Sequence, residues 1–318
     1  MSTALITVGI TCFNAEQTIE KAVHSAMAQD WPNFEIIVVN DHSQDNSLSI
    51  LEKLKEAHDK IRIISNSENL GVAASRNAII EHANGEFIAF FDDDDESHSS
   101  RLSEQHKRIT EYENKYDIGA LVICHCARNQ DYPDGSRRYE PTVGTNKEQE
   151  APHGDVVARR ILIGTPANQL FGSMATCSQM SRTKTYKTLN GFDEDFLRSE
   201  DTDFNVRLSL EGGHFVGIDT PLVNQTMTLD HDKDLETELR YTIKLLDKHK
   251  NYIDQVSSHS FCVNWIKAKY TLLNGHKFLF LKNLFMLFMQ HPIITMKKIF
   301  WALPNLSYNL KLSKHHNG

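Results

Sequence analysis

Short apolar runs alternate with helical segments between residues 5 and 91, and this alternation constrains the fold more than any other feature of the chain. The runs at 5–11, 34–39, 61–64 and 86–91 are rich in Ile, Val and Phe and have the length of buried strands. The segments between them carry apolar residues at helical spacing. This order predicts an α/β fold in which a mostly parallel sheet is flanked by helices on both faces.

Polar residues follow three of these predicted strands, at 11–14, 40–45 and 92–95. Ligands of parallel sheets bind at the carboxyl ends of the strands, so we expect these three segments to converge on one crevice. Asn14, with Gln17 three residues later, is also typical of a helix N-cap.

Four consecutive aspartates, Asp92 to Asp95, come directly after the run EFIAFF. Like charges this close repel one another unless a cation is present. Clustered carboxylate oxygens suit Mg²⁺ or Mn²⁺, particularly when a substrate phosphate completes the coordination. A solvated acidic loop is the alternative, but the position at the end of a strand favours a metal site.

Three further positions allow two interpretations each. Asp41 follows the second strand, where its carboxylate could accept from a nucleotide or cap the next helix. Arg76 could reach a base or phosphate, although an isolated arginine on a helix lies by default at the surface. Glu200 and Asp201 precede an amphipathic helix, where they could supply a general base or simply stabilise the helix dipole.

Beyond the first half, the elements are less regular. The patterns predict helices at 99–114 and 155–163, strands at 118–125, 170–178 and 214–218, and a loop-rich stretch at 128–153.

The composition is that of a globular protein, with 40% apolar and 24% charged residues in 318. Five scattered cysteines without a CxxC pair indicate a reducing compartment. No signal peptide is expected, and no apolar stretch has the ~18 residues of a membrane span. These features predict a cytoplasmic protein that is soluble or peripheral to a membrane.

The net charge of −8 is unevenly distributed. Residues 261–318 contain eight lysines and no Asp, Glu or Arg, so they carry +8 and the remaining residues carry −16. A body at −16 is not expected to bind nucleic acid. Helices that interleave lysines with aromatic residues lie at anionic membrane surfaces, so this segment predicts membrane contact; packing against the acidic body is the alternative.

Four segments together resemble the family 2 glycosyltransferases of GT-A fold. Three belong to the N-terminal half of that family, and the fourth resembles its acceptor-side ED motif; the match runs over about residues 4–210. The segments are ITVGITCFNAEQTIEKAVHSAMAQDWPNFEIIVVNDHSQDNS, NLGVAASRNAII, GEFIAFFDDDDESHSSRL and GFDEDFLRSEDTDFNVRL.

The resemblance implies a Rossmann-like GT-A domain at 1–230, with a nucleotide-binding half at 1–97 and an acceptor-binding half at 98–230. A helical, basic and apolar extension would follow at 231–318. The implied activity is inverting transfer of a sugar from a nucleotide diphosphate donor, most often a UDP-sugar, to a glycan or lipid-linked acceptor in surface polysaccharide synthesis. The expected place of action is the inner face of the cell membrane.

Carried over by position, the resemblance also implies residue roles. Asp93 would lie near the ribose or the Mn²⁺ or Mg²⁺ ion, Asp94 would ligate that ion, and Asp95 falls where a third acid is often found. The nucleotide-binding residues would be Thr11, Asn14, Asp41, Arg76, Asp92 and Asp93.

On the acceptor side, Asp201 would deprotonate the attacking hydroxyl, with Glu200 beside it. The family often places a basic residue after the catalytic helix to hold the diphosphate or metal, and His231 is the candidate here.

Two other functions are compatible with a similar sheet. A nucleotidyltransferase that makes nucleotide sugars should carry a basic, glycine-rich loop after the first strand, but GITCFNAEQ contains no Lys or Arg. A catalytically silent module that binds a nucleotide sugar or glycan would instead be indifferent to the loss of Asp201.

Overall fold

The computed structural model describes residues 3–119, 121–227 and 235–301. The chain divides into two compact units. The first comprises Met1–Ala158 and Ala167–Leu229, and the second comprises Arg159–Pro166 and Asp230–Gly318. The further division of the first unit into halves at residue 97 stays a prediction.

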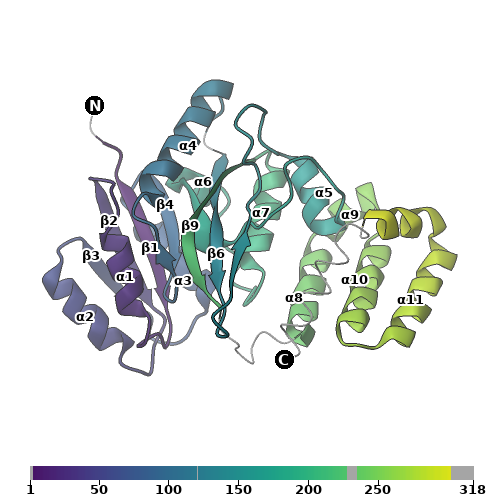
Figure 1. Ribbon diagram of the computed structural model, residues 1–318, viewed down its shortest axis with the longest axis horizontal. Coiled ribbons are helices and arrows are strands. Elements are labelled where there is room, and N and C mark those ends of the chain that lie inside the picture. The colour runs from purple at the N-terminus through teal and green to yellow at the C-terminus, as the bar shows by residue number, and fades with distance from the viewer. Residues whose placement is uncertain (1–2, 120, 228–234, 302–318) are drawn as a thin grey trace. The chain divides into compact units, whose positions relative to one another are not determined.

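The first unit is built on a nine-stranded sheet (Figure 1). Its strands lie side by side in the order β3-β2-β1-β4-β8-β6-β9-β5, and β7 pairs with β6. The strands are β1 Ile6–Cys12, β2 Phe34–Asn40, β3 Ile61–Ser65, β4 Phe87–Asp92, β5 Glu96–Ser97, β6 Val122–Asp131, β7 Arg137–Glu140, β8 Gln179–Arg182 and β9 His214–Thr226.

The four N-terminal strands are all parallel, as the sequence predicts, and so are β6 and β9. The pairs β4–β8, β6–β8, β6–β7 and β5–β9 are antiparallel, which makes the sheet mixed. The helices are α1 Ile19–Met27, α2 Ser47–Ala57, α3 Val72–His82, α4 Arg101–Tyr116, α5 Asp155–Ile163, α6 Thr183–Thr188, α7 Glu200–Leu210, α8 Leu235–Lys248, α9 Lys250–Val256, α10 His259–Leu273 and α11 Lys277–Gln290, with a 3₁₀ turn η1 at Thr176–Ser178.

Helices cover both faces of the N-terminal sheet. Ile10 of β1 belongs to a buried cluster with Ile19 of α1 and Ile109 of α4. Gly9 points to the opposite face, where a Cβ atom would lie only 2.6 Å from Cγ2 of Ile79 on α3. The missing side chain therefore allows α3 to pack closely on β1.

Aromatic side chains bring α6 and α7 to the same face as α3. Phe90 of β4, the register partner of Gly9, contacts the rings of Tyr186 and Phe192, and Tyr186 contacts Phe204 of α7. All four rings are buried. This packing places the first turn of α7 near the carboxyl end of β4.

The less regular half differs from the sequence predictions in three places. β6 begins at Val122 and continues to Asp131, whereas a strand was expected at 118–125. β7 occupies part of the expected loop at 128–153, and the expected strand at 170–178 is replaced by η1 and the polar strand β8. Pairing with distant strands, which single-sequence periodicity does not report, stabilises these polar segments.

The second unit is helical in the part that the structure describes. α10 packs against both α8 and α11, and residues 292–301 are also helical. No helix within the described ranges is long and apolar enough to span a bilayer.

Candidate active site

The three polar strand ends converge, as the sequence predicts. The backbone N–H of Phe13 donates to Oδ2 of Asp93 at 3.0 Å. The N–H of Asn14 donates to Oγ of Ser43 at 3.0 Å. These contacts join the ends of β1, β2 and β4 at one edge of the sheet.

Asn14 is not a helix N-cap, because α1 begins at Ile19 and its cap residue is Thr18. Asn14 has a φ of 50°, in the left-handed region that asparagine tolerates better than most residues. Its Oδ1 atom accepts from the N–H of Gln44 at 2.8 Å, so the side chain connects the loop after β1 to the loop after β2. Its contact with a nucleotide stays a prediction.

Asp41 lies buried at the end of β2 and supports the start of α3. Its carboxylate accepts from Nδ2 of Asn66 at 2.7 Å and from the N–H groups of Leu70 and Gly71 at 2.9 and 2.8 Å. Both carboxylate oxygens therefore hold the loop that leads into α3. Thr11 lies half-buried near the end of β1, in register with Asp92.

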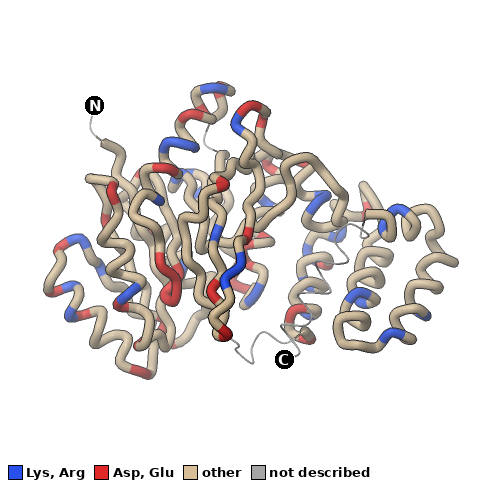
Figure 2. Tube along the Cα trace, viewed as in Figure 1, with Lys and Arg blue, Asp and Glu red and all other residues tan. Residues whose placement is uncertain are grey.

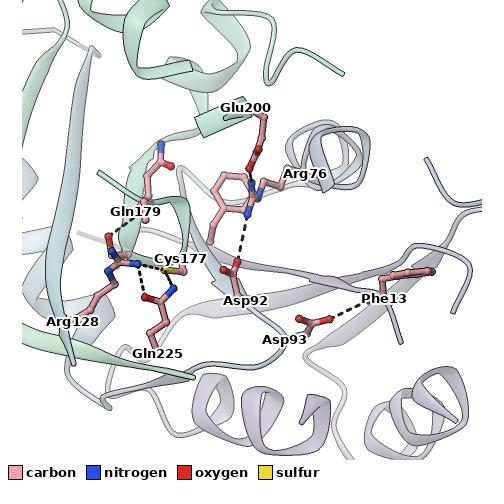
Figure 3. Close-up of polar contacts among 12 residues, drawn as sticks. Phe13, Arg76, Asp92, Asp93, Arg128, Cys177, Gln179, Glu200 and Gln225 are labelled. Atoms are coloured by element: carbon pink, nitrogen blue, oxygen red, sulfur yellow. Dashed lines mark hydrogen bonds and ion pairs between the residues drawn. The ribbon is translucent and has the colours of Figure 1, made fainter. Parts of the chain in front are cut away.

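Arg76 connects the two acidic motifs (Figure 3). The default surface position is wrong for this arginine, which is only 5% exposed. Its guanidinium forms an ion pair with Glu200 and a second, at 3.4 Å, with Oδ1 of Asp92. Burial raises the pKa of Glu200, and the charge of Arg76 opposes that shift. A buried cation thus neutralises acids that lie far apart in the sequence.

The four aspartates are held in different ways. Burial raises the pKa of Asp93 to about 7, although the N–H of Phe13 favours its charged form. Asp95 accepts from the N–H of Thr226 at 3.0 Å through Oδ1. Burial, followed by the charges of Asp92 and Asp94, raises the pKa of Asp95 to about 8. A divalent cation would reverse both shifts, because it stabilises ionised carboxylates.

The residues present fit such a cation. Ligand atoms of Asp92, Asp95 and Cys177 lie within 4.8 Å of one another. Oδ2 of Asp95 is buried and has no hydrogen-bond partner in the described part of the chain. Burial raises the pKa of the Cys177 thiol, whose sulfur accepts from Nη1 of Arg128 at 3.2 Å. The donors that suit Mg²⁺ or Mn²⁺ are therefore the two carboxylates.

Arg128 is a site residue that the sequence interpretation missed. It is buried, and its guanidinium donates to Oε1 of Gln225 at 2.9 Å (Figure 3). It also donates to Oγ of Ser173 at 2.7 Å. Its charge lowers the pKa of Asp95 against the larger effect of burial. A signal was available, because Arg128 follows the apolar run VICHCA as Asp92 follows EFIAFF.

Asp201 lies half-buried in the first turn of α7, next to Glu200. Its Oδ1 atom accepts from the N–H and the hydroxyl of Thr202 at 2.6 and 3.1 Å. His231, the predicted diphosphate contact, lies outside the described residues.

Several named proteins are similar in sequence to parts of this chain. EpsE of Bacillus subtilis, which bears the name "Putative glycosyltransferase EpsE", is 28% identical over 63% of this chain and 65% of its own. The Escherichia coli enzyme WfaP, named as a UDP-Glc:α-D-GlcNAc-diphosphoundecaprenol β-1,3-glucosyltransferase, is 36% identical over 37% of this chain and 49% of its own. The chain thus spans less than two thirds of these relatives.

A solved structure has the same fold. Staphylococcus aureus TarS 1–349, in complex with UDP-GlcNAc, superposes with a TM-score of 0.56 at 18% identity, over 83% of this chain and 71% of that one. The predicted GT-A architecture is confirmed by this likeness. The model of the family described as Glycosyl transferase family 2 matches residues 7–169, which is half of the sequence, and the chain therefore belongs to that family.

Proposed function

We propose that this protein is an inverting glycosyltransferase that moves a sugar from a UDP-sugar to a hydroxyl group of a glycan or lipid-linked acceptor, in surface polysaccharide synthesis. The observation that carries the proposal is the Arg76 bridge. It joins Asp92, in the acidic turn expected to hold the donor, to Glu200, which adjoins the candidate base Asp201. The activity that gives WfaP its name and the UDP-GlcNAc bound to TarS support this choice of donor.

The carboxylates at the end of β4 would hold Mg²⁺ or Mn²⁺. Asp93 and Asp94 are the ligands that the family pattern implies, and the geometry adds Asp92 and Asp95 as candidates. The chemistry that the cation supplies when bound is neutralisation of the charge that develops on the departing diphosphate.

The nucleotide would lie over the ends of β1 and β2, where Thr11, Asn14 and Asp41 are candidate contacts. For Asp41 the three hydrogen bonds favour a positioning role, in which the carboxylate shapes the pocket by holding the loop before α3. These bonds occupy three of the roughly four acceptor positions of the carboxylate, so at most one position stays open to a group of the nucleotide.

Asp201 would act as the general base. As the acceptor oxygen forms its bond to C1 of the sugar, its proton passes to the Asp201 carboxylate, and the bond from C1 to the diphosphate oxygen breaks on the opposite face. Attack opposite to the departing group inverts the configuration at C1. The hydrogen bonds from Thr202 orient the carboxylate for this transfer.

Arg128 would provide a second cation for the anionic donor. The hydrogen bonds of its guanidinium go to the uncharged side chains of Cys177, Gln225 and Ser173. Its charge, which also acts on Asp95, would be directed to a phosphate group of the donor. This position would supply the basic contact that the family pattern places after the catalytic helix.

Calorimetric titration with UDP, with GDP and dTDP as controls, tests the donor assignment in the presence and absence of Mn²⁺. We expect UDP binding that depends on the metal and that Asp94→Ala or Asp95→Ala abolishes, whichever residue ligates the ion. The matched control is Asp59→Ala, which removes an exposed aspartate from the turn between α2 and β3. Arg128→Met should weaken UDP binding by about 10- to 100-fold, the effect of losing a charge-assisted hydrogen bond.

Absence of binding by all three nucleotides, in protein shown to be folded, would exclude the transferase function. Metal binding by Asp94→Ala and Asp95→Ala as tight as that of the unaltered protein would exclude both residues as ligands.

The place of action we propose is the cytoplasmic face of the cell membrane, where the protein would bind as a peripheral component. The acceptor in the name of WfaP is α-D-GlcNAc-diphosphoundecaprenol, a lipid-linked sugar. An acceptor of that class would require the protein to work at a bilayer surface.

A further inference from the structure

The helix α11 is apolar on the side that faces away from its own unit. Phe278 is 91% exposed, Phe285 64% and Met289 66%, and Leu281 is also exposed. These four positions are spaced by three or four residues, so they form one stripe along the helix. Leu287, on the opposite side, is buried. A helix that is apolar on both sides is stable in water only when something covers its outer face.

The helical segment at 292–301, which follows a break at His291, also exposes apolar side chains. Within it, Ile293, Met296 and Phe300 are spaced by three and four residues and are 71%, 57% and 72% exposed. We call these seven side chains of α11 and 292–301 the outer face. With Leu279, Met286 and Phe288, ten large apolar side chains are exposed between residues 278 and 300. This is far more than the scattered single ones of an ordinary soluble surface.

Lysines flank the outer face. Lys277, Lys282 and Lys297 are exposed, and residues 261–318 contain no acidic residue. Figure 2 shows basic but no acidic positions along α11. An occupant must therefore be apolar in its interior and negatively charged at its surface.

We infer that the outer face docks on an anionic lipid bilayer, with the apolar side chains among the acyl chains and the lysines at the phosphates. A second copy of the chain is disfavoured, because two such faces would bring like charges together. The segment 302–318 is disfavoured for the same reason, since it carries Lys311 and Lys314 and no acid. This inference does not depend on the transferase activity and deepens the proposal of a membrane-bound acceptor.

Flotation of the full chain with phosphatidylglycerol–phosphatidylethanolamine vesicles tests the inference against vesicles of phosphatidylcholine alone. We expect binding to the anionic vesicles that weakens with salt, and a fall of at least tenfold in Phe278→Ser/Phe285→Ser. Lys277→Gln/Lys282→Gln should lose about fivefold per lysine. The matched controls are Phe171→Ser, an exposed aromatic of the first unit, and Lys53→Gln/Lys55→Gln on α2.

Three outcomes would overturn the inference. One is equal flotation of the Phe278→Ser/Phe285→Ser protein, with unchanged circular dichroism. Another is a lipid-free dimer in analytical ultracentrifugation that this variant dissociates, which would assign the face to a second copy. The last is flotation that appears only after removal of 302–318, which would show that this segment covers the face. UDP titration of each variant separates these failures from failure of the proposed transferase.

Discussion

In most soluble proteins charged side chains lie at the surface and apolar ones in the core. The two units each depart from this rule, but with side chains of opposite kinds. In the first unit charged groups are buried, and Arg76, Asp95 and Glu200 are each 9% exposed or less. In the second, apolar rings such as Phe278 and Phe300 are exposed. Neither arrangement helps an isolated chain to fold, because buried charges lose hydration and exposed rings order water. We propose that a ligand completes the first place and a bilayer surface the second, so these unusual side chains mark both candidate functional sites.

The largest effect is expected at Asp201, the proposed general base. Asp201→Asn keeps the shape of the side chain but removes the proton acceptor, so turnover should fall about 10²- to 10⁴-fold. UDP binding should be unchanged, since the donor-side acids remain. Turnover measured with a panel of UDP-sugars checks this, with Asp195→Asn as control in the loop before α7. An unaltered turnover would show that another group is the base.

The next effect concerns the buried charges themselves. Arg76→Met leaves Glu200 and Asp92 without their cation and should lower the free energy of unfolding by about 3–5 kcal/mol. The exposed pair of Lys21 and Glu96 gives the contrast, because Lys21→Met should cost less than about 1 kcal/mol. Urea unfolding of both variants measures the difference. Equal losses would mean that the burial of Arg76 has no energetic consequence.

Two phenylalanines, one buried in the first unit and one exposed in the second, allow the same substitution to be compared in both units. Phe204 is fully buried among the rings that position α7, so Phe204→Ala should lower the free energy of unfolding by about 3–5 kcal/mol. Phe278→Ala, at an exposed position, should change it by no more than about 0.5 kcal/mol. Thermal unfolding in the absence of lipid compares them. A large loss at Phe278 would show that its ring is covered by protein, against the docking inference.

The N-terminal half of the sheet was predictable because the spacing of apolar residues within each element indicates its type. A buried strand and the helix after it are read from apolar spacing within about ten residues, and β1 to β4 occur within one or two residues of their predicted ranges. The convergence of their ends then follows from parallel pairing.

The other half was less predictable because polar strands depend on partners. β8 reads QMSR, which has no strand pattern, yet it pairs with β4 on one side and with β6 on the other. The last residues of β6, RNQD, pair with β9 and β7 and were expected to be a loop. Asn14 shows the same limit locally, because its backbone conformation follows from contact with the next loop.

The sequence by itself determined the family, the α/β alternation, the acidic turn after β4 and the basic, apolar C-terminal segment. Each of these features depends on residues that are close together in the chain. Only the tertiary structure decided which partners the charged side chains meet. Arg76 and Glu200 are 124 residues apart, and Asp95 and Thr226 are 131 apart. Only the tertiary structure, too, showed which rings of α11 stay exposed. Burial and ion pairing are properties of neighbours in space, and no spacing along the chain encodes them.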